Sequence, residues 1–390
     1  MKRGLVVLDP LEVTPEEYAQ RVRGLQELLR ASGCGLGLIY GDVYRSGDLA
    51  YLTNLCLYWN EGILAVPAEG EIAFLTKLSP RVHPWIRSTA TVSDLRSGQD
   101  LAALVEAVAA EHPGGAVGLV EETWWPAPLL ESVRKRLADR PIRDLEGMVR
   151  ALRRRPSEAE RRLLRQSARL AAIAVAVAAS ASGACSERVA AAERELRRAG
   201  VRDAVLWCDP RPGGAWTFEA RVDWRGYWAH AARTVLTGRI PPKPAEQFVE
   251  AYQEATATLR AGVRQSQVEE MVRSHTEGLW EGCSVEVVEH VDLETWGEHR
   301  PPEAQDEPIH EGAVVSLALR LRGPEGAWWV AADTFEVHAT RADRLTDHVP
   351  PVPVWRMEVG SGGRHADSHQ RGDRAGAHHA GLHRGPGAGL

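Results

Sequence analysis

The sequence contains few lysines and carries no excess of positive charge. Only four of its 47 basic residues are lysine, and the formal net charge is −6. Proteins that bind the phosphate backbone of nucleic acids usually show a basic excess. The composition therefore argues against a nucleic-acid partner. The scarcity of lysine, together with abundant alanine, glycine and proline, reflects a GC-rich coding sequence and not a function.

Cysteines and long apolar runs are also scarce. The five cysteines are widely spaced and include no Cys-x-x-Cys pair, so we expect neither a disulfide framework nor a structural zinc site. The first residues, MKRGLVVLDPLEV, are charged and interrupted by Pro10, unlike a signal peptide. The longest apolar run, residues 170–179, is much shorter than the ~20 residues of a membrane span and predicts a buried helix. We therefore expect a cytoplasmic protein without a membrane partner.

A chain of 390 residues, 44% of them hydrophobic, is long enough for two domains. In residues 1–150 helices alternate with short apolar strands, beginning with a helix capped by Thr14, and this pattern predicts an α/β layer domain. Pro156 ends one element, and Ser157 with Glu160 predicts the capping box of the next helix. The domain boundary is therefore expected near residue 150.

Residues 151–350 show one pattern twice. Two helices are followed by strands, and two further helices are followed by more strands, which predicts a repeated helix-helix-sheet unit and an α/β (α+β) fold overall. From Gly360 the chain is rich in glycine and histidine and has almost no apolar residues. Such a composition cannot form a core, so we expect a disordered tail over residues 351–390.

The stretch RGYWAHAARTV, Arg225 to Val235, has the pattern of a strand that carries metal-binding carboxylates into an active site. A Gly-Tyr step comes first and an Arg-Thr step follows. Between Tyr227 and Arg233, however, the sequence is Trp-Ala-His-Ala-Ala, without a carboxylate. The strand is present and its acids are missing.

Several motifs together resemble the aminopeptidase P, prolidase and creatinase family. They are YLTN, RRPSEAERRLLRQSARLA, GYWAHAARTVLTG, YQEATATLRAGVRQSQVEEMV, EPIHEGAVVSLAL and AADTFEVHATRADRLT. Their order and spacing over roughly residues 16–346 carry the resemblance. It implies a creatinase-like N-terminal domain, a C-terminal pita-bread domain of two pseudo-symmetric halves, and a homodimer. Arg233 matches a structural arginine that holds strands together.

In family members that are peptidases, two Asp, one His and two Glu bind two metal ions. By motif these positions fall here on Glu219, His230, Asp292 (with His290 as a neighbouring candidate), Ala318 and Ala332. Two close cations need bridging carboxylates to offset their repulsion, and alanine offers no ligand. The resemblance therefore implies the fold without the dinuclear site.

The metal-free creatinase mechanism also lacks its parts. It needs a histidine before the catalytic strand, and no histidine occurs between Ser157 and Ala229. Its two glutamates would fall on Ala232 and Ala318. Neither known chemistry of the family can be carried over to this chain.

Some functional groups remain at these positions. Glu219, His230 and Asp292 could hold a single divalent ion, although no cofactor is the first expectation. His299, in GEHRPP, aligns with a substrate-facing histidine of the family and could act as an acid or base. The resemblance thus gives catalytic candidates His230, Glu219 and His299. Candidates for substrate binding are Tyr227, Trp228, Trp296 and His290. All of them also fit ordinary structural roles.

Two functions stay open at this point, and the histidine retained at position 230 favours the first of them. One is an enzyme with altered hydrolase-like or lyase-like chemistry, acting on a small amine, amide or amino-acid-derived substrate in bacterial specialised metabolism. The other is a non-catalytic protein whose former cleft binds a peptide or protein partner. An enclosed pocket around Glu219, His230 and His299 would favour the enzyme, and an open groove lined by tryptophans would favour the binder. The alanines argue against a third function, an active proline-specific peptidase.

Overall fold

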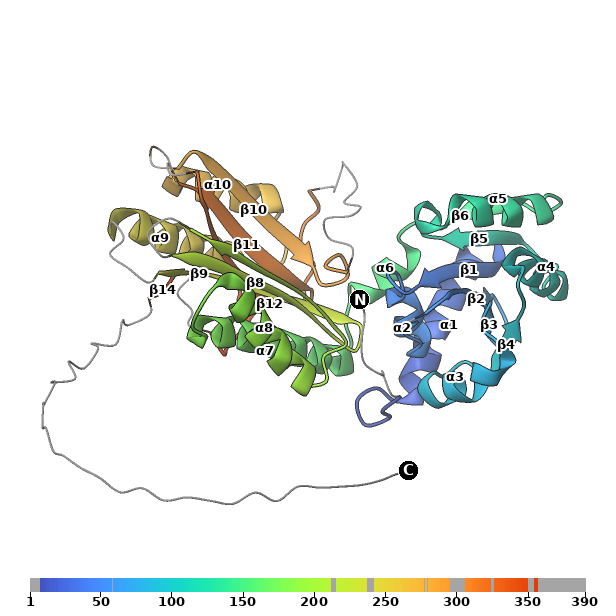
Figure 1. Ribbon diagram of the computed structural model, residues 1–390. Coiled ribbons are helices and arrows are strands. Elements are labelled where there is room, and N and C mark those ends of the chain that lie inside the picture. Colours follow the sequence, from blue (N-terminus) through green and yellow to red (C-terminus); the bar gives the residue numbers. More distant parts are fainter. Residues whose placement is uncertain are drawn as a thin grey trace, which may run out of the picture. The chain divides into compact units, whose positions relative to one another are not determined.

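The computed structural model describes residues 8–57, 59–211, 215–236, 242–276, 278, 280–294, 306–323, 326–349 and 354–356. Residues Met1–Met357 form one compact unit. It contains a six-stranded sheet and an eight-stranded sheet, which Figure 1 shows with their helices. The predicted mixed α/β fold class is confirmed.

The first sheet has the order β4-β3-β2-β1-β5-β6 and mixes parallel and antiparallel pairs. Its strands are β1 (Cys34–Asp42), β2 (Glu61–Pro67), β3 (Ala73–Thr76), β4 (Asp94–Ser97), β5 (Ala116–Val120) and β6 (Ile142–Asp144). The helices are α1 (Pro15–Ala31), α2 (Gly47–Thr53), α3 (His83–Thr89), α4 (Leu101–Glu111), α5 (Ala127–Arg136) and α6 (Met148–Arg153), with short 3-10 turns at Pro80–Val82 and Glu122–Trp124.

The second sheet has the order β10-β11-β12-β9-β8-β7, so two three-strand units meet at β12 and β9. Its strands are β7 (Asp203–Pro210), β8 (Trp216–Trp224), β9 (Tyr227–Leu236), β10 (Gly282–Glu289), β11 (Val314–Arg322) and β12 (Trp328–Val337), with β13 (Ala342–Arg344) beside β12 and β14 (Val354–Arg356) beside β9. Two helices precede each unit: α7 (Glu158–Ser180) and α8 (Cys185–Arg198), then α9 (Pro242–Thr258) and α10 (Gln265–Thr276). This arrangement confirms the repeated unit. The predicted tail 351–390 is wrong at its start, because β14 lies within it; residues 357–390 lie outside the described residues.

Helix starts follow the capping chemistry expected from the sequence. The Thr14 hydroxyl accepts a hydrogen bond from the Glu17 amide at the start of α1. Ser157 and Glu160 form the predicted capping box of α7. By length and composition α7 could cross a membrane, but its apolar side packs into the core against β8 and β9. The expected buried helix is therefore found there.

One face of the second sheet is covered by helices, and we call it the helix face. Alternate residues such as Phe218, Ala231 and Val235 pack there with α7 and α8, while Leu317 and Phe335 pack with α9 and α10. The other face carries the remaining alternate residues, among them Glu219 and His230, and we call it the inner face. Both Glu219 and Arg221 lie on the inner face because they are two residues apart on β8.

A fully buried ion pair joins the two halves of the sheet on the helix face. Arg233 of β9 donates to both carboxylate oxygens of Asp333 on β12 at 2.9 Å, and both residues are 0% exposed. The Tyr252 hydroxyl of α9 donates to Asp333 at 2.8 Å, and Thr346 and Arg344 add further bonds. This confirms the prediction that Arg233 holds strands together.

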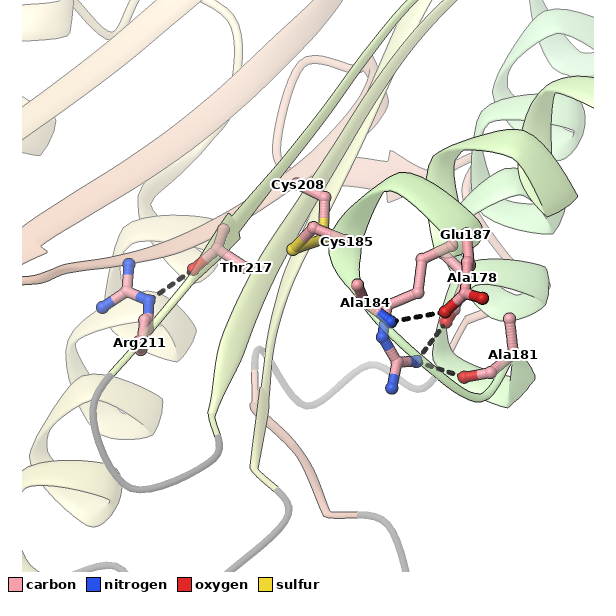
Figure 2. Close-up of a disulfide and its surroundings, with 9 residues drawn as sticks. Ala178, Ala181, Ala184, Cys185, Glu187, Cys208, Arg211 and Thr217 are labelled. Carbon is pink, nitrogen blue, oxygen red and sulfur yellow. Dashed lines mark hydrogen bonds between the residues drawn. A yellow bond between two sulfur atoms is a disulfide. The ribbon is translucent and has the colours of Figure 1, made fainter.

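A disulfide fastens β7 to the start of α8. Cys185 is the first residue of α8, and its sulfur bonds to Cys208 of β7, with the two Cα atoms 5.3 Å apart (Figure 2). The expectation that the cysteines form no disulfide is wrong for this pair. Spacing alone could not show it, because Cys185 and Cys208 meet only when α8 packs beside β7.

The disulfide is expected to stabilise the fold by about 3 kcal/mol, because it removes loop entropy from the unfolded chain over a separation of 23 residues. Cys185→Ser with Cys208→Ser should lower the free energy of unfolding by this amount in urea titrations. Cys283→Ser is the matched control, since Cys283 is free. Equal stability of the double variant and wild type would contradict the prediction.

Candidate inner-face site

One row of residues crosses the inner face in register, with one residue from each strand. In the order β7, β8, β9, β12, β11 and β10, the row consists of Trp207, Glu219, Ala232, Ala332, Ala318 and Glu286. Three adjacent strands therefore present methyl groups between two acids. The three alanines are at most 2% exposed and pack with Val330 in a small apolar cluster.

Glu219 is held by three nitrogen-bearing side chains. Arg221 donates to Oε1 at 2.5 Å, and Arg320 of β11 donates to Oε2 at 2.8 Å. Nε2 of His230 lies 3.2 Å from Oε1. Both oxygens of this buried carboxylate are thus engaged by guanidinium groups, and Glu219 has its counter-charges within the protein.

His230 is buried at the centre of the inner face and is 2% exposed. Its Nδ1 lies 2.8 Å from the Ser316 hydroxyl, and its backbone amide donates to Thr334 Oγ1 at 2.9 Å. Burial lowers the pKa of His230, and the nearby Arg221 and Arg320 lower it further, against the opposing effect of Glu219. A neutral ring fits these contacts: Nε2–H points to Glu219 and Nδ1 accepts from Ser316.

Burial alone would raise the pKa of Glu219. The charge interactions with His230, Arg320 and Arg221, together with the hydrogen bond from His230, outweigh burial and hold the pKa well below its usual range. Because the low pKa of His230 keeps that ring uncharged near neutral pH, we attribute the charge stabilisation mainly to the two arginines. Glu219 is therefore a permanent anion at physiological pH and a poor proton acceptor.

Comparison with solved structures identifies the fold. The chain superimposes on an Xaa-Pro dipeptidase from Bacillus anthracis with a TM-score of 0.72 and 15% identity, covering 87% of this chain and 100% of that one. An X-Pro aminopeptidase from Thermotoga maritima MSB8 gives 0.72 and 16%, covering 86% and 99%. A prolidase from Pyrococcus horikoshii OT3 gives 0.69 and 14%, covering 84% and 98%.

The chain has the pita-bread fold of these proteins. The resemblance seen in the sequence motifs is thereby confirmed at the level of structure. No protein-family model matches the sequence, and no curated protein matches it at a significant level. The match extends over 98–100% of the length of each of the three structures.

The residues of this pita-bread protein do not fit the two metal ions that the resemblance implies. Ala318 and Ala332 supply no ligand, and Glu219 already binds two guanidinium groups. Within the described ranges, no group of three or more His, Cys, Asp or Glu side chains is placed to hold a metal ion. The motif positions on these strands hold one acid, which is bound by two arginines, and alanines.

The structure does not assemble the three residues considered for a single ion. Asp292 pairs with Arg150 and lies 3.7 Å from Arg154, because the turn after β10 directs it toward basic side chains of α6 and its C-terminal end. Glu219 and His230 instead contact each other and the inner-face arginines. The described contacts therefore give no support to one ion held by these three residues together.

His290 is buried and only 4% exposed. Its backbone amide donates to the Val314 carbonyl at 2.9 Å. Burial lowers its side-chain pKa to about 3, and the positive charge of Arg153 contributes to the shift. His290 thus lies inside the packed structure and not on an accessible substrate surface.

The low pKa of His290 predicts loss of stability in acid. The folded state binds this proton only near pH 3, whereas the unfolded chain binds it below about 6.5, so protonation favours unfolding as the pH falls. Between these values the contribution falls by about 1.4 kcal/mol per pH unit. Urea titrations of wild type and His290→Gln from pH 8 to pH 4 test this. The variant should lose less stability over that range, and parallel losses would contradict the prediction.

The other predicted residues are placed as follows. Tyr227 lies on the helix face, where its hydroxyl donates to Glu160 at 3.1 Å and accepts from Arg21 at 3.3 Å, so it is a structural contact with α7 and α1. Trp228 lies on the inner-face side but is buried against Val288 and Leu293, at 4% exposure. His299 and Trp296 lie outside the described residues.

Sequence reasoning missed the basic half of this site. Arg221, Arg320, Ser316 and Glu286 were not singled out, because the motif comparison looked for carboxylates at fixed positions. A signal was available: Arg221 comes two residues after Glu219, and Arg320 two residues after Ala318, so strand alternation puts each on the same face as the position it follows. Their meeting across the sheet required the strand order.

Proposed function

We propose that this protein is a non-catalytic member of the pita-bread fold that binds a peptide or a small molecule on the inner face of its second sheet. The observation that carries the proposal is the Glu219 cluster. Glu219 is the one acid at the motif positions on β8, β9, β11 and β12, and two arginines neutralise it. The next three residues in the row across the inner face are alanines.

The chemistry of the cluster supports binding more than catalysis. A general base works best with a pKa near the operating pH and a free direction toward the substrate. Glu219 has a pKa far below that range, and His230 has Ser316 and Glu219 at its two ring nitrogens. Neither group offers a proton acceptor to an incoming molecule.

Exposed aromatic surface on the same face supports a binding role. Trp207 is 66% exposed and Trp328 is 39% exposed, and both lie on the inner face. Tryptophan side chains of this kind provide large contact areas for apolar or cationic ligands. His230 is the residue that would favour a small-molecule enzyme, and both of its ring nitrogens lie against side chains of the protein itself.

The test combines activity with metal content. Purified protein is incubated with Ala-Pro, with Ala-Pro-Ala and with creatine, each with and without added Mn²⁺, Co²⁺ or Zn²⁺, and products are followed by mass spectrometry. We expect no turnover and less than stoichiometric metal by elemental analysis. Turnover of any substrate that is lost in both Glu219→Gln and His230→Gln would overturn the proposal in favour of the enzyme.

A further inference from the structure

We propose that β7 binds an extended peptide segment by strand addition, and that this segment carries apolar side chains between two basic ones. The proposal deepens the proposed binding function by naming the partner's chemistry. It concerns the edge of the second sheet next to Glu219.

β7 is an edge strand. Over its length, Asp203 to Pro210, it pairs antiparallel with β8, and it has no second partner strand among the described residues. Such an edge leaves alternate backbone N–H and C=O groups pointing outward, where an added strand can pair with them. Pro210 comes only at the end, so the preceding seven residues keep their amide hydrogens.

The inner-face side of β7 presents an apolar centre between acids. The alternate residues are Asp203, Val205, Trp207 and Asp209. Val205 is 50% exposed and Trp207 is 66% exposed. Of the five exposed large hydrophobic residues of the described chain, these two and Trp328 lie on this one face. Exposed apolar side chains gathered on an open edge indicate a contact surface.

The opposite side of β7 is already fastened. Ala204, Leu206 and Cys208 pack toward α7 and α8, and the Cys185–Cys208 disulfide joins the strand to α8 (Figure 2). β7 is therefore held in its extended conformation before any partner arrives. A preformed strand loses little conformational entropy when a peptide pairs with it, and this favours affinity.

Charge selects the partner. Neither Asp203 nor Asp209 forms a salt bridge within the described part of the chain, whereas Glu219 in the next strand has Arg221 and Arg320. A second copy of β7 pairing antiparallel about Leu206 would place Asp203 opposite Asp209 at both ends. Like charges directly opposite each other destabilise a strand pair, and opposite charges stabilise it. The acids thus favour a segment with basic residues over a second copy.

The experiment uses a labelled seven-residue probe, Lys-Thr-Val-Thr-Val-Thr-Lys. Its two lysines are spaced to pair with Asp203 and Asp209, and its two valines to contact Val205 and Trp207. Binding to the full chain is measured by fluorescence anisotropy. We expect Trp207→Thr to weaken binding at least about tenfold through lost apolar contact. Asp203→Asn with Asp209→Asn should weaken it about threefold to tenfold through two lost charge pairs. Trp207 and Asp209 are exposed and Asp203 is half-buried at the start of β7, so the variants should fold.

Backbone pairing has its own control. Two N-methylated probes are used, one methylated on the odd-numbered amides and the other on the even-numbered amides. In strand addition only alternate amides of the peptide face β7. One of the two probes should therefore lose binding and the other should keep it. A Glu-Thr-Val-Thr-Val-Thr-Glu probe should bind more weakly than the lysine probe. Equal binding of both methylated probes, or of wild type and Trp207→Thr, would overturn the proposal.

Two other results would also overturn it. Sedimentation velocity showing a dimer that Trp207→Thr disrupts would assign the edge to a second copy. No binding of the lysine probe by wild type would reject the strand-addition site, while the absence of peptidase turnover would still stand as support for the non-catalytic function. Turnover of Ala-Pro without probe binding would reject both. The two proposals can therefore fail separately.

Discussion

Asp333→Ala is expected to lower the free energy of unfolding by about 3–5 kcal/mol, because removal of one partner leaves the buried Arg233 guanidinium without its counter-charge. The substitution also removes the acceptor for Tyr252, Thr346 and Arg344. Since Arg233 and Asp333 join β9 to β12, the loss falls where the two halves of the sheet meet. Urea unfolding followed by far-UV circular dichroism measures it.

Asp343→Ala is the control for this experiment. Asp343 also pairs with an arginine, Arg341 at 2.9 Å, but its side chain is 47% exposed. Exposed ion pairs contribute about 0–1 kcal/mol, so this variant should stay close to wild type. Equal losses in the two variants would show that burial is not the reason for the large contribution of the Arg233–Asp333 pair to the free energy of unfolding.

Glu219→Ala is expected to destabilise the protein by about 3–4 kcal/mol at pH 7, because Arg221 and Arg320 then remain close together without the acid between them. The pKa of Glu219 is lower in the folded state than in the unfolded chain, so its contribution is fully present above about pH 4.3. It is lost as the pH falls further. The difference between wild type and variant should therefore shrink in acid.

A second substitution tests the cause of that loss. Glu219→Ala with Arg320→Met removes one of the two positive charges that Glu219 balances, and we expect it to recover about 1–2 kcal/mol relative to Glu219→Ala alone. Glu269→Ala, which breaks an exposed pair with Arg273 at 2.6 Å, is the control and should change stability by about 0.5 kcal/mol or less. A double variant less stable than the single one would contradict the charge explanation.

Local chemistry made the fold readable from the sequence. The caps at Thr14 and at Ser157 with Glu160 start α1 and α7 as expected, because capping depends on residues three positions apart. The repeat of two helices and three strands followed from periodicity and recurs in the sheet order. These signals need no knowledge of distant contacts, and for that reason they were reliable.

The site was predictable only in part, because its contacts span the whole sheet. Glu219 and His230 were identified from motif spacing, and the structure does bring them together. Arg320 reaches Glu219 from 101 positions later in the chain, and Ser316 reaches His230 from 86 positions later. Asp292 was predicted to join them, but its nearest basic neighbours come from α6, which spacing within the second domain could not reveal.

The charge of the buried Glu219 is balanced by the polypeptide itself. In the cluster the counter-ions of the buried acid are two guanidinium groups of the same polypeptide. Because these arginines are part of the same chain as Glu219, a chelator cannot remove them and a competing ion cannot replace them. Starvation for transition metals would leave the charge balance of this sheet intact. Two arginine residues of the chain itself therefore set the charge balance of this buried acid.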